Sequence, residues 1–493
     1  MDAPATRQRP PDTGEAAGSS QAHTRFMAAV VIVAAAGLWL PQLTSSFTAD
    51  ETVTNWVIRD GVRQTLDRSY QFEQQHSLYF LIESAVKRTL GSSELALRMP
   101  SILAMGVALW LVWRLGRRLG GEEMGFLTAA VFATSPGIIF AAGDARPYAL
   151  AILGLIGSSL ALVRWADTQS KRDAVAYVLL AAATLYFHYL VAIALAVHPL
   201  YVWLRRDRIR PSNYGVALAA IAVLMIPAIP HAYSVFQRRG ILEINIPVSG
   251  SDLFTVLFPS VLVGSIALGA LISWRWGPVR ILKATLQPAG PSLILGLWIL
   301  PPGILFAITK VGSTLFEPRY LFFALPGMAL VGGAAIRSLD PERARRLTLV
   351  TLAVVALILF NTKTHSGEDW RGAADVERVI AASDTPVLFR PNFIEAKQID
   401  WLSRPAKLEY LSAELVRYPM RGRIFPIPYD LTDAAKRYLK PVLERLRSSN
   451  RFVLVNDRGA FQPWLEGRFP GYTARRVPGG GLVTLVLFEK RAG

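Results

Sequence analysis

Long apolar runs without charged residues recur along the first three quarters of the chain and stop near residue 361. A helix that crosses a bilayer needs about 20 such residues, and these runs fit that length better than a soluble core. The pattern therefore predicts an α-helical polytopic membrane protein with about eleven spans, several of them short. The predicted spans are 26–43, 99–113, 124–142, 147–163, 174–187, 189–204, 214–236, 253–274, 290–309, 320–336 and 347–361.

Basic residues are distributed unevenly between the connections of these spans. One alternating set of short connections carries seventeen Lys and Arg residues, and the intervening set carries five. Cytoplasmic loops of membrane proteins are the ones enriched in Lys and Arg. We therefore predict a cytoplasmic N-terminus and, with an odd number of spans, a C-terminus on the outer side.

Two of the predicted spans have alternative interpretations. The run 174–204 is 31 residues long and has basic clusters at both ends. A single crossing would put one cluster outside, so two short helices with an outer turn at His188-Tyr189 are favoured. The first run could be a signal peptide, but it is long and lacks a clear cleavage site, which favours an uncleaved anchor. The polar segment 1–25 before it is predicted to be a disordered cytoplasmic tail.

Two larger regions lie on the predicted outer side. The first is 44–98, in which the amphipathic segment 77–90 is too short and too charged to span, and is expected to lie at the membrane interface. The second is 362–493, with 22 basic and 15 acidic side chains. We predict an extracytoplasmic α/β domain there. Its expected helices are 373–383 and 432–449, and its expected strands are 385–389, 451–456 and 481–488.

Composition narrows the function classes. The 493 residues include no cysteine, which excludes disulfides and thiolate metal sites. Only 18% of residues are charged, yet the net charge is +17. On a soluble chain this charge would suggest a nucleic-acid partner. Here the basic residues between spans set the topology, so the bilayer is the predicted partner and nucleic acid is not.

The predicted topology brings polar residues from separate connections to the outer face. Each has an ordinary structural explanation by itself, such as a solvated acidic pair, a capping histidine or an interfacial arginine, and for Asp144 and Arg146 a mutual ion pair is as good an explanation as a substrate role. Together they suit an anionic lipid-linked substrate, because a carboxylate can act as a base and arginines bind phosphate. The residues are Asp50, Glu51, His76, Arg98, Asp144, Arg146, Tyr148, His188, Tyr189, Glu317, Arg319 and Tyr320.

Several short strings carry a family resemblance. Asp50-Glu51 follow the first span, HSLYF begins at His76, LRMPS contains Arg98, and ARPYAL, FHYL and EPRYLFFALPG open later segments. In this order the chain resembles bacterial GT-C glycosyltransferases, in particular the family of protein O-mannosyltransferases and lipid A aminoarabinose or galacturonic acid transferases. The resemblance covers roughly 26–375. One departure is Ser77, where the family often has Pro-Pro.

The resemblance implies a GT-C fold in the bacterial inner membrane and a sugar donor carried on polyprenyl phosphate. It implies that Asp50 is the catalytic base, that Glu51 is the second acid of the pair, and that Arg146, His188 and Arg319 line the carrier or sugar site. The expected reaction is inverting transfer to a glycan, lipid or protein acceptor. No cofactor is required, although a divalent ion between Asp50 and Asp144 is compatible with the sequence.

Two other functions fit the sequence less well. A transporter or lipid flippase would be expected to place polar residues near the middle of the membrane, often in repeated halves, whereas these charges gather at one face. A noncatalytic scaffold would tolerate changes at Asp50, Arg146 and Arg319. The sequence does not name the sugar or the acceptor.

Overall fold

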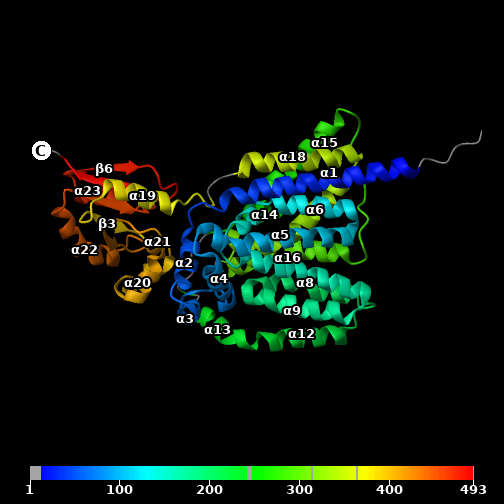
Figure 1. Cartoon of the computed structure of the whole chain (residues 1–493), viewed down its shortest axis with the longest axis horizontal. Helices are drawn as coiled ribbons and strands as arrows, with labels where there is room; N and C mark the ends of the chain where they lie inside the picture. The colour runs from blue at the N-terminus through cyan, green and yellow to red at the C-terminus, as the bar shows by residue number, and fades with distance from the viewer. Residues whose placement is uncertain (1–12, 239, 241–246, 313–314, 362–364, 492–493) are drawn as a thin grey trace, which may run out of the picture.

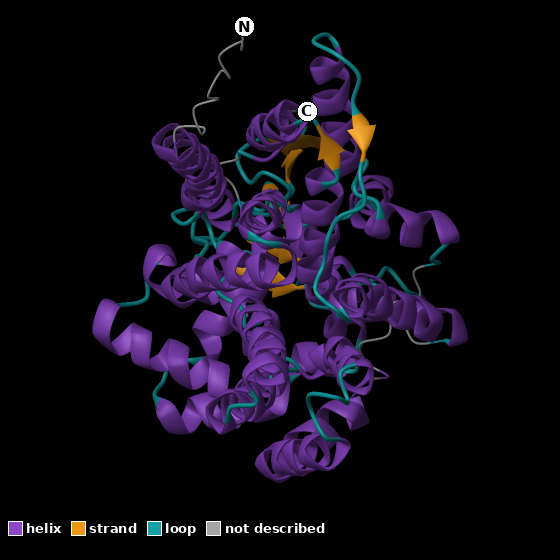
Figure 2. Cartoon of the chain, turned by 90° about the vertical axis from the view of Figure 1, so that its right-hand side faces the viewer, coloured by secondary structure: helices purple, strands orange, loops and turns teal. Residues whose placement is uncertain are grey.

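The computed structural model describes residues 13–238, 240, 247–312, 315–361 and 365–491. Figure 1 shows a large body of roughly aligned helices, with the C-terminal region (residues 365–491) packed at one of its ends. Turned by 90°, the helices of the body are seen nearly end-on, with strands behind them (Figure 2). The site described below lies where the body meets the C-terminal region.

All eleven predicted apolar runs fall on one helix or on two or three successive helices. The helices of the body are α1 (Thr13–Trp39), α5 (Glu94–Gly120), α6 (Glu122–Thr134), α7 (Pro136–Ala142), α8 (Tyr148–Thr168), α9 (Lys171–Phe187), α10 (Ala192–Leu195), α11 (Val197–Leu204), α12 (Pro211–Met225), α13 (Ile229–Arg238), α14 (Gly250–Leu257), α15 (Ser260–Trp274), α16 (Gly290–Val311), α17 (Leu325–Arg337) and α18 (Glu342–Phe360). Short 3-10 helices join some of them, among them η1 (Leu40–Gln42), η2 (Tyr189–Val191), η3 (Ile226–Ala228) and η5 (Pro318–Ala324).

Fewer of these helices are long enough to cross a membrane alone. Within the described residues, six helices have the length and composition of a span, and up to eight if each bent pair counts as one. The helix α9 and the run Tyr189–Leu204 are shorter, and α18 begins with several charged residues. The protein is thus a multi-span membrane protein, while the full number of eleven crossings stays a prediction.

The breaks between helices follow the sequence. Prolines begin α7 and immediately precede α15, where the chain bends by 72° and 52° respectively. Proline has no N–H to continue the preceding helix and its ring disfavours helical geometry in the residue before it. The predicted turn at 188–189 is also present, because α9 ends at Phe187 and His188 is extended.

The N-terminal helix starts earlier than expected. The segment 1–25 was predicted to be disordered, but α1 already begins at Thr13, so this prediction is wrong from there on. The residues after Pro11 contain Ala, Glu and Gln, which favour helix once no further proline intervenes. The part of the predicted tail before Thr13 lies outside the described residues.

The region 44–98 folds into three short helices, α2 (Ala49–Val57), α3 (Val62–Phe72) and α4 (Ser77–Leu90). The last one has the bounds of the predicted interfacial helix. Their buried side chains, such as Phe47, Trp56 and Tyr79, share one hydrophobic core with Trp370 and Val387 of the C-terminal region. Residues 44–98 and the C-terminal region are therefore packed as one unit at one end of the helical body.

The C-terminal region contains a five-stranded mixed sheet in the order β4-β3-β5-β7-β6. Its strands are β3 (Pro386–Phe389), β4 (Arg423–Pro426), β5 (Arg451–Val455), β6 (Tyr472–Val477) and β7 (Leu485–Lys490), and its helices are α19 (Trp370–Ile380), α20 (Pro405–Leu411), α21 (Ala413–Arg417), α22 (Asp433–Arg447) and α23 (Phe461–Arg468), with 3-10 turns η6 (Ile394–Lys397) and η7 (Ile399–Ser403). The strands β3 and β4 run parallel, as do β3 and β5, and β7 is antiparallel to both neighbours.

The sequence predicted β3, β5 and the first four residues of β7, whose apolar runs are clear. It missed the two edge strands β4 and β6. The strand β6 contains exposed arginines and lacks a continuous apolar run. A further pair of two-residue strands, β1 (Arg280–Ile281) and β2 (Leu339–Asp340), joins two connections of the helical body.

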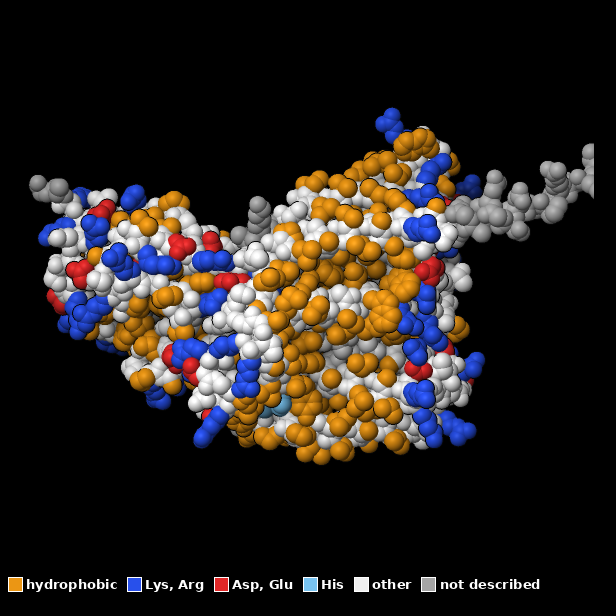
Figure 3. Space-filling view, viewed as in Figure 1, with side chains coloured by type: hydrophobic (Ala, Val, Ile, Leu, Met, Phe, Trp, Pro, Cys, Tyr) orange, Lys and Arg blue, Asp and Glu red, His pale blue; other side chains and the backbone are white. Residues whose placement is uncertain are grey.

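Hydrophobic and basic side chains occupy different parts of the surface of the helical body. On the face shown in Figure 3, hydrophobic side chains cover much of the helical body, and Lys and Arg gather at the end opposite the C-terminal region. The cation-bearing ends of α5, α8 and α17 contribute Arg117, Arg164 and Arg337. The orientation in the membrane stays a prediction.

Candidate active site

Asp50 lies in the first turn of α2, whose start is tightly defined. Thr48 is the N-cap: its hydroxyl accepts a hydrogen bond from the Glu51 N–H, and the Glu51 carboxylate accepts one from the Thr48 N–H. This reciprocal capping fixes the first turn. The Asp50 carboxylate consequently projects from a rigid helix end and not from a loop.

The Asp50 carboxylate meets an arginine from a distant part of the chain. Arg319, in η5, donates from Nη1 to Asp50 Oδ2 at 2.8 Å, and both side chains are partly exposed, at 47% and 39%. The two residues are 269 positions apart. An acid that follows the first apolar run and an arginine that directly precedes the tenth thus meet in the structure.

Arg146 lies beside them and is almost fully buried. Its Nη2 donates to Glu73 at 3.0 Å and to Gln75 at 2.9 Å, and its Nη1 donates to the Asp50 backbone carbonyl at 3.3 Å. Of the two roles left open for Arg146, the ion pair with Asp144 is not formed, because Glu73 supplies the counter-charge. Arg146 is therefore oriented firmly next to Asp50.

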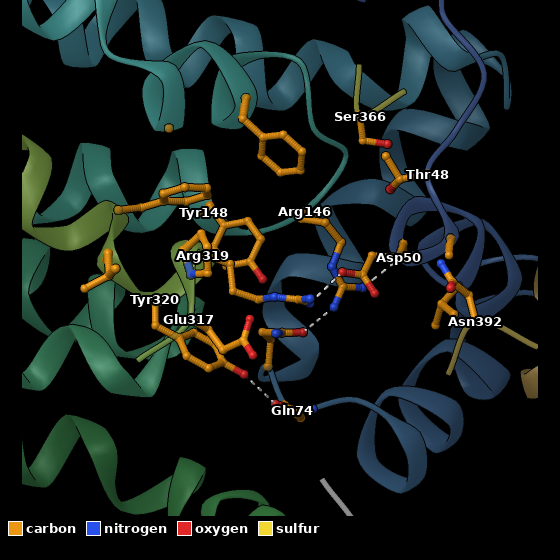
Figure 4. Close-up of a pocket in the computed structure, with 18 of the residues that line it drawn as sticks. Thr48, Asp50, Gln74, Arg146, Tyr148, Glu317, Arg319, Tyr320, Ser366 and Asn392 are labelled. Carbon is orange, nitrogen blue, oxygen red and sulfur yellow. Dashed lines mark hydrogen bonds and ion pairs between the residues drawn. The ribbon is translucent and has the colours of Figure 1, made fainter. Parts of the chain in front are cut away.

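These residues line a cavity of about 940 Å³ between the helical body and the C-terminal region. In Figure 4, Arg146 and Arg319 extend toward Asp50 from one side, and Asn392 of the C-terminal region lies on the other. Of the residues singled out in the sequence, the cavity is lined by Asp50, Arg146, Tyr148, Glu317, Arg319 and Tyr320. One wall is apolar and is formed by helices of the body, including Phe140, Val256, Trp298, Leu325 and Met328.

Glu51 and Arg98 do not line this cavity. They form a fully buried ion pair with two short bonds, Arg98 Nε to Oε1 at 2.7 Å and Nη2 to Oε2 at 2.6 Å. Glu51 also accepts from the Ala145 N–H. Burial alone would raise the pKa of Glu51, but the charge and the hydrogen bonds of Arg98, together with the Ala145 N–H, hold that pKa below its ordinary value. All oxygens of Glu51 are engaged, which argues against the expected catalytic role and for a structural one.

Arg98 ties this pair to the end of the first span. Its Nη1 and Nη2 groups donate to backbone carbonyls of Gln42, Leu43, Ser45 and Ser46. The expected substrate contact of Arg98 is thus replaced by a clamp on the segment that leads to Asp50. The burial of both charges explains why neither reaches the cavity.

Asp144 belongs to a different cluster from the one expected. Among the described residues, Glu51, Asp144 and His365 form the group whose possible metal-ligand atoms all lie within 4.8 Å of one another. His365 Nε2 is 3.3 Å from Asp144 Oδ1, and burial raises the pKa of the Asp144 carboxyl. A divalent ion fits poorly here, since Arg98 already neutralises Glu51 and would repel the ion. Among the described residues, no group of three possible metal ligands contains both Asp50 and Asp144, where the sequence suggested an ion.

His76, His188 and Tyr189 lie near the cavity without lining it. His76 caps α4 by accepting from the Leu78 N–H at 3.2 Å. His188 is buried against the rings of Tyr148 and Tyr320, which do line the cavity. Tyr189 bonds to His231 at 2.8 Å. These three side chains, His76, His188 and Tyr189, lie outside the cavity lining and contact its walls or neighbouring helices.

Comparisons with known proteins bear on the fold that carries this site. Residues 78–233, less than half of the chain, match the family model described as dolichyl-phosphate-mannose-protein mannosyltransferase. Among solved structures, ArnT from Cupriavidus metallidurans bound to undecaprenyl phosphate is similar with a TM-score of 0.54 and 11% identity, over 94% of this chain and 98% of that chain. The same protein in the apo state gives 0.53 and 13%, with the same coverage of both chains. The chain has the GT-C fold. No curated protein matches it in sequence.

Within this GT-C fold, most of the residues that line the cavity are not among the predicted site residues. Glu73, Gln74 and Gln75 precede His76 directly, and their position next to a recognised string was a usable signal. The C-terminal region gave no such signal, because its cavity-lining residues look like ordinary loop positions. They are Ser366, Glu368, Asn392, Phe393, Ile394, Glu395, Tyr410, Tyr429 and Arg458.

Proposed function

We propose that this protein transfers a sugar from a polyprenyl phosphate carrier to a cell-envelope acceptor, with inversion at the anomeric carbon. The observation that carries this proposal is the contact of Asp50 with Arg319 in a cavity that has one apolar wall. A carboxylate beside a cation, next to a surface for a lipid chain, suits a phosphate-linked glycosyl donor.

The proposed reaction assigns each group a role. Asp50 accepts the proton of the acceptor hydroxyl, whose oxygen attacks the anomeric carbon as the bond from that carbon to the phosphate oxygen breaks. The departing phosphate becomes a monoester and gains negative charge. Arg319 is exposed enough to leave Asp50 and bind this phosphate, whereas Arg146, held by Glu73, contributes a fixed positive charge beside it.

The orientation in the membrane is part of the proposal. The basic residues gather at the end of the helical body opposite the cavity, which supports a cytoplasmic N-terminus and an outer, periplasmic location for the C-terminal region. ArnT was solved with undecaprenyl phosphate, and a carrier of this kind is the donor class we propose. The apolar wall of the cavity supports the same choice, and no metal ion takes part in the proposed step.

A transporter is the second function to be tested. It would be expected to place its charged residues near the middle of the membrane, but these lie under the C-terminal region at one end of the body. Purified protein in detergent should therefore be incubated with radiolabelled polyprenyl phosphate sugars. Release of free polyprenyl phosphate supports transfer, whereas intact donor after prolonged incubation with every sugar of a broad panel contradicts it.

A further inference from the structure

Glu395 is a buried acid on the cavity wall that the proposed reaction does not use. It lies in η6, its side chain is buried, and Tyr410 donates a hydrogen bond to its Oε1 at 3.2 Å. Within the part of the chain that the structure describes, no ion pair to Glu395 is found. By contrast, Asp50 and Glu73 on the same cavity are paired with Arg319 and Arg146.

Burying a carboxyl group without a counter-charge costs free energy, and a ligand that bonds to the group reduces this cost. Burial raises the pKa of Glu395, and the negative charges of Glu73 and Asp50 act in the same direction. Glu395 shares the cavity with the proposed base and offers its carboxyl group for hydrogen bonds with a ligand. Such a group suits a neutral, hydroxyl-rich ligand better than an anionic one.

Aromatic rings surround this acid. Tyr410 packs between Phe72 at 5.1 Å and Phe393 at 5.2 Å between ring centroids, and all three rings line the cavity. Amide side chains complete the wall: Gln74, which accepts from the Tyr320 hydroxyl at 3.5 Å, and Asn392. Rings that contact the C–H groups of a sugar, together with carboxyl and amide groups that bond its hydroxyls, make a carbohydrate-binding surface.

The same wall is poorly suited to an extended peptide. Peptides commonly bind by adding a strand to an exposed sheet edge. The cavity-lining residues of the C-terminal region belong to none of the strands β3 to β7. The polar groups offered to a ligand are therefore side chains rather than a row of backbone N–H and C=O groups.

We infer that the C-terminal wall of the cavity is an acceptor subsite for a sugar ring, in which Glu395 and Gln74 bond its hydroxyls and Phe393 packs against it. This inference rests on the proposed function, and it adds that the acceptor is a glycan or a glycolipid headgroup. The donor would then enter along the apolar wall, and the acceptor from the side of the C-terminal region.

The test measures transfer to small acceptors. Purified full-length protein is given a labelled polyprenyl phosphate sugar that it consumes, together with either methyl glycosides of glucose, mannose, galactose, N-acetylglucosamine and arabinose or a Ser/Thr-rich peptide. We expect at least one glycoside, and not the peptide, to be extended. Glu395→Gln should raise the KM for that glycoside roughly 10- to 100-fold, as expected for loss of a hydrogen bond to a charged or strongly polar group, with a smaller change in kcat.

Two further variants keep the test decisive. Tyr410→Phe removes one hydroxyl and should raise the same KM if Glu395→Gln does not fold, while Glu466→Gln, an exposed position on α23, should match the wild type. Transfer to the peptide, extension of no glycoside, or an unchanged glycoside KM in folded Glu395→Gln overturns the inference. Failure of the wild type to consume any donor instead overturns the proposed function, so the two failures are distinguishable.

Discussion

The buried pair of Glu51 and Arg98 provides a quantitative test of what holds the site together. Glu51→Gln keeps the shape of the side chain but removes its charge, while both side chains are 0% exposed. Breaking a buried ion pair by removing one partner costs about 3–5 kcal/mol. The new amide group also faces donors, because Thr48 and Ala145 both direct N–H groups at this side chain.

Arg98→Met should cost at least as much as Glu51→Gln. It leaves the Glu51 charge buried and also removes the donor that serves four backbone carbonyls. Glu444→Gln is a matched control, since Glu444 is 60% exposed and pairs with Arg447 one turn away. Exposed changes of this kind usually alter stability by less than about 0.5 kcal/mol.

The assay is thermal unfolding of the purified variants in detergent, followed by tryptophan fluorescence, together with donor consumption. We predict that Glu51→Gln and Arg98→Met lower the melting temperature strongly and that Glu444→Gln does not. Activity at low temperature should fall only in proportion to the fraction unfolded. If Glu51→Gln is as stable as wild type yet inactive, the reasoning is refuted and Glu51 acts on the substrate.

Three further changes test other parts of the site. Arg319→Ala should lower kcat by roughly 100- to 1,000-fold in donor-release assays, as expected for loss of a group that stabilises developing charge; an unchanged kcat would exclude Arg319 from that role. Glu368→Gln should lower kcat roughly 10- to 100-fold by loosening α2, since its carboxylate accepts from Ala49, Trp370 and Asn392, and an unaltered kcat would show that this anchor is dispensable. Burial raises the pKa of Glu83 from 4.5 to about 8. Between these two pH values the unfolded chain has lost a proton that the folded protein keeps, so the stability of the fold falls as pH rises. Glu83→Gln should flatten that fall in melting curves taken from pH 5 to 8, and parallel curves for the two proteins would contradict the assignment.

Much of the helical body could be predicted because hydrophobicity and loop charge are local properties of the sequence. Each apolar run has its helix, and the break at His188 followed from the basic clusters that flank it. The ends of α1 and the short helices were less predictable, since polar residues with good helix propensity extend a helix beyond its apolar part. The edge strands of the sheet were missed for the opposite reason, because they lack an apolar run.

The site could be predicted only in part. Asp50 and Arg319 were found because each stands at the outer end of an apolar run, so topology alone brings them to the same face. Residue type does not distinguish the roles of Glu51 and Arg98 from those of Asp50 and Arg319. The first pair is buried and the second is partly exposed, and this difference decides their roles. Glu395 gave no signal, because the residues around it lie in segments whose approach depends on a core shared between residues 44–98 and the C-terminal region.

The most direct test of the central claim is donor consumption by Asp50→Asn. The account predicts that wild-type protein releases polyprenyl phosphate from its labelled donor, and that Asp50→Asn, folded and inserted normally, loses roughly 100- to 10,000-fold in rate, the range for a missing general base. Asp375→Asn is the control, because Asp375 is 62% exposed and pairs only with Arg378 among the described residues. Near-normal release by Asp50→Asn would contradict the account.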